Sequence, residues 1–170
     1  MKVLDKFTIN KPVKILFVCL GNICRSSAAD GIMQNLVKEK GEEKDFVIDS
    51  AGFYGGHAGD LPDSRMRAHA IRRGYNLTHR SRTVKDEDFD YFDIIIAMDD
   101  SNYSNLRDRA NTLEQTEKIV KMASFLRLHP YADYIPDPYY GGAEGFENVL
   151  DLLEDGCLGL YDEIKNKTNQ

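Results

Sequence analysis

The chain has 170 residues, of which 42% are hydrophobic, a length and composition typical of one compact domain. Its 28 acidic and 22 basic side chains give a formal net charge of −6, which argues against a broad nucleic-acid surface because such binding requires a basic footprint. The three cysteines show no disulfide-framework spacing, so we expect a cytoplasmic protein rather than a secreted one.

The first twelve residues form a polar extension with Lys2, Lys6 and Lys11, and we expect it to be disordered or to lie against a sheet edge. The domain itself is predicted to span residues 13–170. The apolar run at 15–20 is too short for a membrane span and lacks a small-residue cleavage site. We therefore predict a core strand there, and neither an anchor nor a signal peptide.

Short apolar, β-branched runs alternate with helix-period segments along the rest of the chain. Strands are predicted at 13–18, 46–50, 93–98 and 119–122. Helices are predicted at 27–40, 64–73, 101–110 and 146–165. This alternation predicts an α/β fold: a single three-layer domain with a central four-stranded parallel sheet and helices on both faces.

The connection between the first strand and the first helix carries the most informative residues. Cys19 ends the strand and Arg25 opens the helix, with Gly21 and Asn22 between them. Gly and Asn adopt positive φ most easily, so backbone N–H groups here can turn inward and bind an anion at the helix N-terminus. We predict a phosphate-binding loop after the first strand, made of Leu20, Gly21, Asn22, Ile23, Cys24 and Ser26.

This environment favours nucleophilic chemistry at sulfur. Inward N–H groups, the helix dipole and a guanidinium all stabilise a negative charge, so Cys19 should be a thiolate at neutral pH. Arg25 presents a planar fork that can bind two oxygens of a phosphoryl group as charge spreads in the transition state. Cys19 and Arg25 are therefore candidate catalytic residues.

Residues 19–26 resemble the signature loop of the low-molecular-weight protein tyrosine phosphatases, C-L-G-N-I-C-R-S-P. Ser27 replaces the usual proline and Asp30 the usual glutamate. The resemblance extends over about residues 13–160 and implies hydrolysis of phosphotyrosine in proteins, and of small aryl phosphates, through a phosphocysteine intermediate, with no cofactor and no metal. The loop would bind phosphate or other oxyanions.

A second segment, near the C-terminus, matches the family's D-P-[YF] pattern. Asp137 lies between Pro136 and Pro138, which favour an extended backbone. A thiolate nucleophile needs a proton donor for the leaving oxygen and then a base for the attacking water. By the resemblance, Asp137 takes both roles.

The resemblance also implies residues that support the loop and line the cleft. Ser50, in S-A-G, and His79, in H-x-[SA]-R, would form a hydrogen-bond network with Asn22 and Ser26, and Ser26 would donate to the sulfur. Gly56 falls where many members carry a cleft tryptophan. The missing aromatic surface would come from Tyr54, Phe53 or the pair Tyr139 and Tyr140.

Several alternatives stay open at this point. Cys24 is either a redox partner that protects Cys19 or a packed side chain. A protein-arginine phosphatase is disfavoured by Ile23, where relatives of that type usually have threonine. A thioredoxin-coupled arsenate reductase needs a downstream cysteine pair, and only Cys157 follows. The C-x4-C spacing does not predict zinc, because no histidine pair completes the set.

The stretch from Ser64 to Lys85 carries seven basic residues and no acid. This stretch either steers anionic substrates or is an ordinary solvated helix face.

Overall fold

The computed structural model describes residues 2–139 and 141–168. Four strands form one parallel sheet in the order β2-β1-β3-β4. The strands are β1 (Val13–Cys19), β2 (Phe46–Gly52), β3 (Ile94–Ala97) and β4 (Ile119–Lys121). The sequence-based prediction of four parallel strands is confirmed, with every boundary within two residues.

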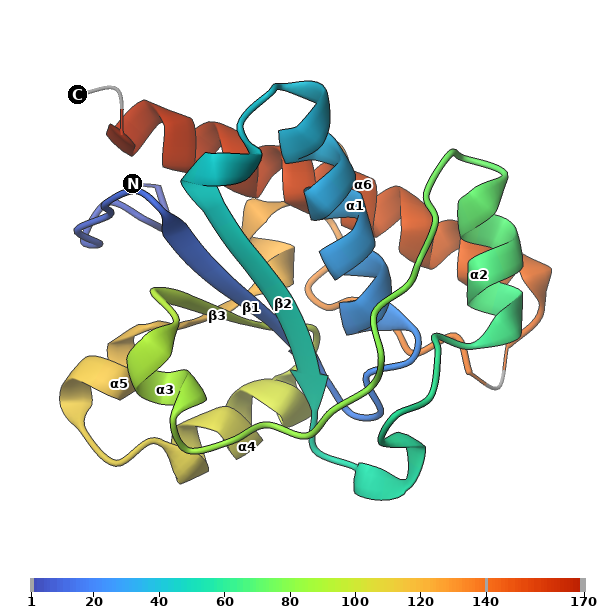
Figure 1. Ribbon diagram of the computed structural model, residues 1–170, viewed down its shortest axis with the longest axis horizontal. Coiled ribbons are helices and arrows are strands. Elements are labelled where there is room, and N and C mark those ends of the chain that lie inside the picture. Colours follow the sequence, from blue (N-terminus) through green and yellow to red (C-terminus); the bar gives the residue numbers. More distant parts are fainter. Residues whose placement is uncertain (1, 140, 169–170) are drawn as a thin grey trace.

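Helices cover both faces of the sheet, so the three-layer prediction is also confirmed (Figure 1). On one face lie α1 (Arg25–Glu39) and α6 (Ala143–Thr168), with α2 (Ser64–Ile71) packed beside α6. The other face carries α3 (Asp88–Tyr91), α4 (Asp100–Arg109) and α5 (Leu113–Glu117). Three short 3₁₀ turns are Glu43–Asp45, Gly55–His57 and Met122–Phe125.

The alternation of side chains along β1 divides the core into two layers. Ile15 and Phe17 face α1 and α6, whereas Leu16 and Val18 face the opposite layer, where α4 contributes Leu106. These four side chains of β1 are fully buried. A strand buried on both faces reads as a continuous apolar run, and this is the pattern found at residues 15–18.

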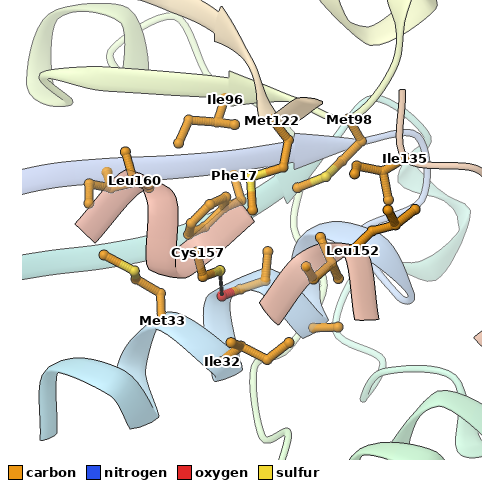
Figure 2. Packing of buried hydrophobic residues seen from close by; sticks show 14 of the residues in the cluster. Phe17, Ile32, Met33, Ile96, Met98, Met122, Ile135, Leu152, Cys157 and Leu160 are labelled. Carbon is orange, nitrogen blue, oxygen red and sulfur yellow. Dashed lines mark hydrogen bonds between the residues drawn. The ribbon is translucent and has the colours of Figure 1, made fainter. Parts of the chain in front are cut away.

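The long helix α6 closes the larger core layer. Figure 2 shows Cys157 on α6 among Phe17, Met33 and Leu160, with its thiol donating to the carbonyl of Ala29 in α1. Burial raises the pKa of Cys157, so this thiol is protonated and serves packing. Within residues 2–139 and 141–168, no helix combines the length and the apolar character needed to cross a membrane.

The structure adds elements that periodicity did not predict. Helices α3 and α5 have only four and five residues, too few to show a hydrophobic period. Helix α5 does carry a capping signal, because the Thr112 side chain accepts from the Gln115 N–H.

The segment before β1 packs against the domain. Leu4 is only 1% exposed, and its N–H donates to the buried Glu163 of α6. Other residues of the segment lie beside the edge strand β4. Leu4 therefore belongs to the core, although a division of the chain at residue 13 stays a prediction.

Candidate active site

The loop of residues 20–24 lies at the carboxyl end of β1, directly before α1. Open α/β sheets bind ligands at this edge, and the neighbours of β1 bring β2 and β3 to the same place. The sequence predicted positive φ at both Gly21 and Asn22. Asn22 does take a φ of 58°, but Gly21 does not adopt positive φ. The left-handed turn is made at Asn22 alone.

Three carbonyl groups of the loop accept hydrogen bonds from residues outside it. Phe53 and Tyr54 N–H groups donate to the Leu20 carbonyl, and the Asp63 N–H donates to that of Ile23. The Ser81 hydroxyl donates to the Gly21 carbonyl. Because C=O and N–H point in opposite directions across a trans peptide, the following N–H groups turn toward the loop centre. Inward N–H groups of this kind are the arrangement found in anion-binding nests, and anion binding here stays a prediction.

Cys19 stands at the end of a directed hydrogen-bond chain. Its Sγ lies 3.0 Å from the Ser26 Oγ, which accepts from Asn22 Nδ2 at 2.8 Å. Asn22 Oδ1 in turn accepts from the Arg82 N–H and lies 2.9 Å from His79 Nε2. Since that oxygen is an acceptor, His79 Nε2 carries the proton. Ser26 keeps its own proton, which it can donate to the sulfur at 3.0 Å or to the Ala51 carbonyl at 3.4 Å.

Behind this chain lie Asp30 and Ser50. The Ser50 hydroxyl donates to Asp30 Oδ2 at 2.9 Å rather than to Asn22, so this hydroxyl reaches Asn22 through Asp30 and His79. Burial raises the pKa of Asp30 to about 7, against the opposing effect of the Ser50 hydrogen bond. Burial likewise lowers the pKa of His79, although Asp49 opposes this.

Arg25 is 3% exposed and is fixed at one edge of its guanidinium. Nη1 donates to Asp99 Oδ2 at 2.7 Å and to the carbonyl of Ile135 at 3.0 Å. Burial alone would lower the pKa of Arg25, but the neighbouring Cys19, Asp99 and Asp137 raise it, so the group stays charged. The other nitrogen, Nη2, lies 3.7 Å from Asp137 Oδ2.

Asp137 lines the same cleft, although it lies more than 100 residues further along the chain than Arg25. Its Oδ1 accepts from the Tyr139 N–H at 3.0 Å, which holds the carboxyl in a tight local turn. The side chain is 42% exposed, so the carboxyl stands at the cleft mouth while Cys19 lies at its floor, 3% exposed.

A cleft of about 360 Å³ joins these groups. Its lining residues are Cys19, Leu20, Gly21, Ile23, Cys24, Arg25, Tyr54, His57, Asp137 and Tyr139. Burial raises the pKa of the Cys24 thiol, which is therefore protonated beside Cys19. Tyr140, also predicted for the cleft, lies outside the described residues.

Tyr54 occupies the space beside Gly56. A Cβ atom at position 56 would overlap the Tyr54 ring, so the glycine and the tyrosine fit each other. The Tyr54 ring meets His57 edge-on at 5.4 Å, and His57 lies 6.4 Å from the ring of Tyr139. These three rings give the cleft an aromatic wall.

Two residues of the site were missed from the sequence. His57 lies in the segment that was aligned, but it was given no role. Asp99 follows the apolar run 94–98, at the carboxyl end of the strand that pairs with β1. The parallel-sheet rule applied to that position would have placed Asp99 beside the loop.

The fold and the site together define a class: a three-layer α/β protein whose loop after β1 brings Cys19 into one cleft with the guanidinium of Arg25 and the carboxyl of Asp137. The sequence model of the family described as "Low molecular weight phosphotyrosine protein phosphatase" matches residues 14–170. The chain belongs to this family.

Individual relatives agree with this assignment. A putative low molecular weight protein-tyrosine-phosphatase of Synechocystis is 44% identical over 152 residues, covering 89% of this chain and 96% of the relative. A protein tyrosine phosphatase of Entamoeba histolytica, crystallised with Hepes in its active site, is 42% identical with a TM-score of 0.88, covering 92% and 99%. A Drosophila arginine phosphatase is 32% identical with a TM-score of 0.82, covering 89% and 97%.

Proposed function

We propose that this chain is a metal-independent phosphatase that hydrolyses phosphotyrosine in proteins, and small aryl phosphates, through a phosphocysteine intermediate. The observation that carries the proposal is the convergence of Cys19, Arg25 and Asp137 on one cleft, although more than 100 residues separate the first from the last. The three free cysteines suit a reducing compartment, and we place the enzyme in the cytoplasm.

The first half-reaction transfers the phosphoryl group to sulfur. The Cys19 thiolate attacks phosphorus, the bond from phosphorus to the phenolic oxygen breaks, and Asp137 gives its proton to that oxygen. Arg25 and the inward N–H groups bind the non-bridging oxygens as negative charge spreads over them. Asp99 and the Ile135 carbonyl hold Arg25 from behind, leaving Nη2 toward the cleft.

The second half-reaction regenerates the enzyme. A water molecule attacks phosphorus through its oxygen while the Asp137 carboxylate takes a proton from that water. The S–P bond then breaks to release inorganic phosphate. The sulfur leaves as a thiolate and accepts the hydrogen bond that Ser26 can supply at 3.0 Å. At the end of the cycle Asp137 is protonated again, and the electron pair of the S–P bond has returned to the Cys19 sulfur.

The aromatic wall supports an aryl substrate. The ring of a phosphotyrosine reaching Cys19 would pass between Tyr54 and Tyr139, where ring contacts are worth about 1 kcal/mol each beyond area burial. A substrate without an aromatic ring would forgo these contacts. The same wall supports a preference for phosphotyrosine over phosphoarginine.

The decisive experiment measures turnover of para-nitrophenyl phosphate and a phosphotyrosine peptide in the presence of EDTA. We expect chelator-insensitive activity in the wild type, none in Cys19→Ser, and a large fall in Asp137→Asn. The matched controls are Cys157→Ser, which changes a thiol outside the cleft, and Asp133→Asn, which changes an acid outside the cleft. Both variants should retain turnover.

Two results would direct the assignment elsewhere. Faster hydrolysis of a phosphoarginine peptide than of its phosphotyrosine counterpart would identify an arginine phosphatase. Arsenate reduction coupled to thioredoxin, without phosphatase activity, would identify a reductase of the same fold.

A further inference from the structure

We propose that Asp30, Asp49 and His79 form a binding site for a divalent transition-metal ion such as Zn²⁺, on the side of the phosphate loop facing away from the cleft. The three side chains come from α1, from β2 and from the segment before Arg82. One donor atom of each lies within 4.8 Å of the other two. The site would be structural, and the proposal does not depend on the proposed phosphatase activity.

Two of the three ligand spacings, those that involve His79, match a tetrahedral ion. His79 Nδ1 lies 3.5 Å from Asp30 Oδ2 and 3.4 Å from Asp49 Oδ1. In a tetrahedral zinc site with bonds of about 2.1 Å, neighbouring ligand atoms are about 3.4 Å apart. The donor set, one imidazole and two carboxylates, also suits zinc.

The imidazole is presented with its free nitrogen toward the two carboxylates. His79 Nε2 carries the proton, because it faces Asn22 Oδ1, an oxygen that already accepts from the Arg82 N–H. Nδ1 is then the nitrogen with a lone pair to offer. A metal-bound histidine commonly donates its second N–H to a partner that fixes the ring, and Asn22 is that partner here.

The oxygens that face Nδ1 are also oriented. Asp30 Oδ2 accepts from the Ser50 hydroxyl, and Asp49 Oδ1 accepts from the Ser50 N–H at 2.8 Å. Each carboxylate oxygen has a further lone pair, so these hydrogen bonds hold the ligand atoms without using them up.

The local charge favours a divalent cation. Arg82 is the nearest guanidinium, and it bonds the other oxygen of Asp49 and both oxygens of Asp88. With Asp30 ionised and His79 neutral, the carboxylates of Asp30, Asp49 and Asp88 face one positive charge, a formal charge of −2. Because burial raises the pKa of Asp30 to about 7, a metal ion that binds there would displace a proton from part of the Asp30 population. An ion of charge +2 balances this set.

Access and a fourth ligand come from an adjoining cavity of about 570 Å³, which all three residues line. A cavity of this size admits a hydrated ion and leaves room for water as the remaining ligand. Lys38 and Glu43 line the same cavity with opposite charges. The ion would hold the far end of the chain that runs through Asn22 and Ser26 to Cys19.

Metal binding can be measured without any turnover. We would dialyse Cys19→Ser/Cys24→Ser protein against chelator, so that the loop thiols cannot bind the ion, and titrate it with ZnCl₂ and then CoCl₂. We expect one equivalent to bind, a rise in Tm on zinc addition, and intense visible Co²⁺ bands of a four-coordinate site. Asp49→Asn should weaken binding at least tenfold, and Glu43→Gln, an acid of the same cavity, should leave it unchanged.

Asp30→Asn, which changes the buried ligand, provides a second test and should also weaken binding. If Asp30→Asn fails to fold, the result with Asp49→Asn decides the question. Absence of binding at millimolar metal would overturn the proposal, as would equal binding in Asp49→Asn and the parent. None of these readouts requires an active enzyme, so failure of the metal site and failure of the phosphatase proposal are separable.

Discussion

Asp99 offers the sharpest perturbation of the site, because it bonds the guanidinium of Arg25 and can be replaced by asparagine, which has nearly the same shape. Its Oδ2 accepts from Arg25, and its Oδ1 accepts from the Asn102 N–H as the N-cap of α4. Asparagine caps helices as well as aspartate does. Asp99→Asn can therefore keep the cap through its amide oxygen, which turns the NH₂ group toward Arg25 and removes both the charge and the acceptor that faced it.

The expected magnitude follows from the bond that is weakened. A hydrogen bond between charged partners contributes about 1.5–3 kcal/mol, and the amide NH₂ cannot replace it because it offers Arg25 no acceptor. Loss of the 2.7 Å bond should therefore remove about 1.5–3 kcal/mol of orienting energy. If that energy holds Arg25 in the geometry needed only in the transition state, kcat falls about ten- to a hundredfold.

The assay is steady-state hydrolysis of para-nitrophenyl phosphate, with urea unfolding to verify that stability is retained. Asp100→Asn is the matched control, because Asp100 stands next in the same helix, is largely exposed and pairs only with Lys121 among the described residues. Wild-type kcat in Asp99→Asn, or an equal loss in Asp100→Asn, would refute the claim that Asp99 positions Arg25.

Three further predictions address the loop and the fold. Gly52→Ala should abolish most activity, because its Cβ would lie 2.6 Å from the Leu20 carbonyl, whereas Gly142→Ala, which meets nothing within 4 Å, should be silent in the same turnover assay. Asn22→Gly should stay more active than Asn22→Ala, since both lose the side-chain bonds but only alanine is strained at a φ of 58°; equal activities would contradict this. Burial raises the pKa of Asp155, but bonds from His129 and three backbone N–H groups outweigh it and lower the pKa, so this stabilisation is present at neutral pH and is lost in acid. Asp155→Asn should accordingly cost about 2 kcal/mol in urea unfolding at neutral pH, and a cost that persisted below about pH 3 would be the contrary result.

The sequence was sufficient to predict those elements whose hydrophobic pattern lies within one continuous segment. The run at 13–18 defined β1 because a strand buried on both faces must be apolar throughout, and the α6 pattern at 146–165 persisted over enough turns to show its period. Cys19 and Arg25 were predicted as site residues from residue type and spacing, and Asp137 from the family resemblance; the structure places all three at one cleft, and their catalytic roles stay predictions.

The remainder of the site depends on tertiary contacts. Asp99 and the Ile135 carbonyl reach Arg25 across 74 and 110 residues, and a backbone carbonyl leaves no signature in residue type. Ser50 was expected among the partners of Asn22 but bonds Asp30 instead, because register in the sheet decides which side chain it meets. The pairing of Tyr54 with Gly56 likewise depends on the path of the loop after β2.

The central claim is that the Cys19 sulfur becomes covalently phosphorylated during turnover. Rapid acid quenching of the enzyme with substrate, followed by peptide mass spectrometry, tests it directly. We predict one phosphoryl group on the peptide that contains Cys19, lost in Cys19→Ser and longer-lived in Asp137→Asn. Turnover with no adduct on that peptide, or undiminished hydrolysis by Cys19→Ser, would contradict the account.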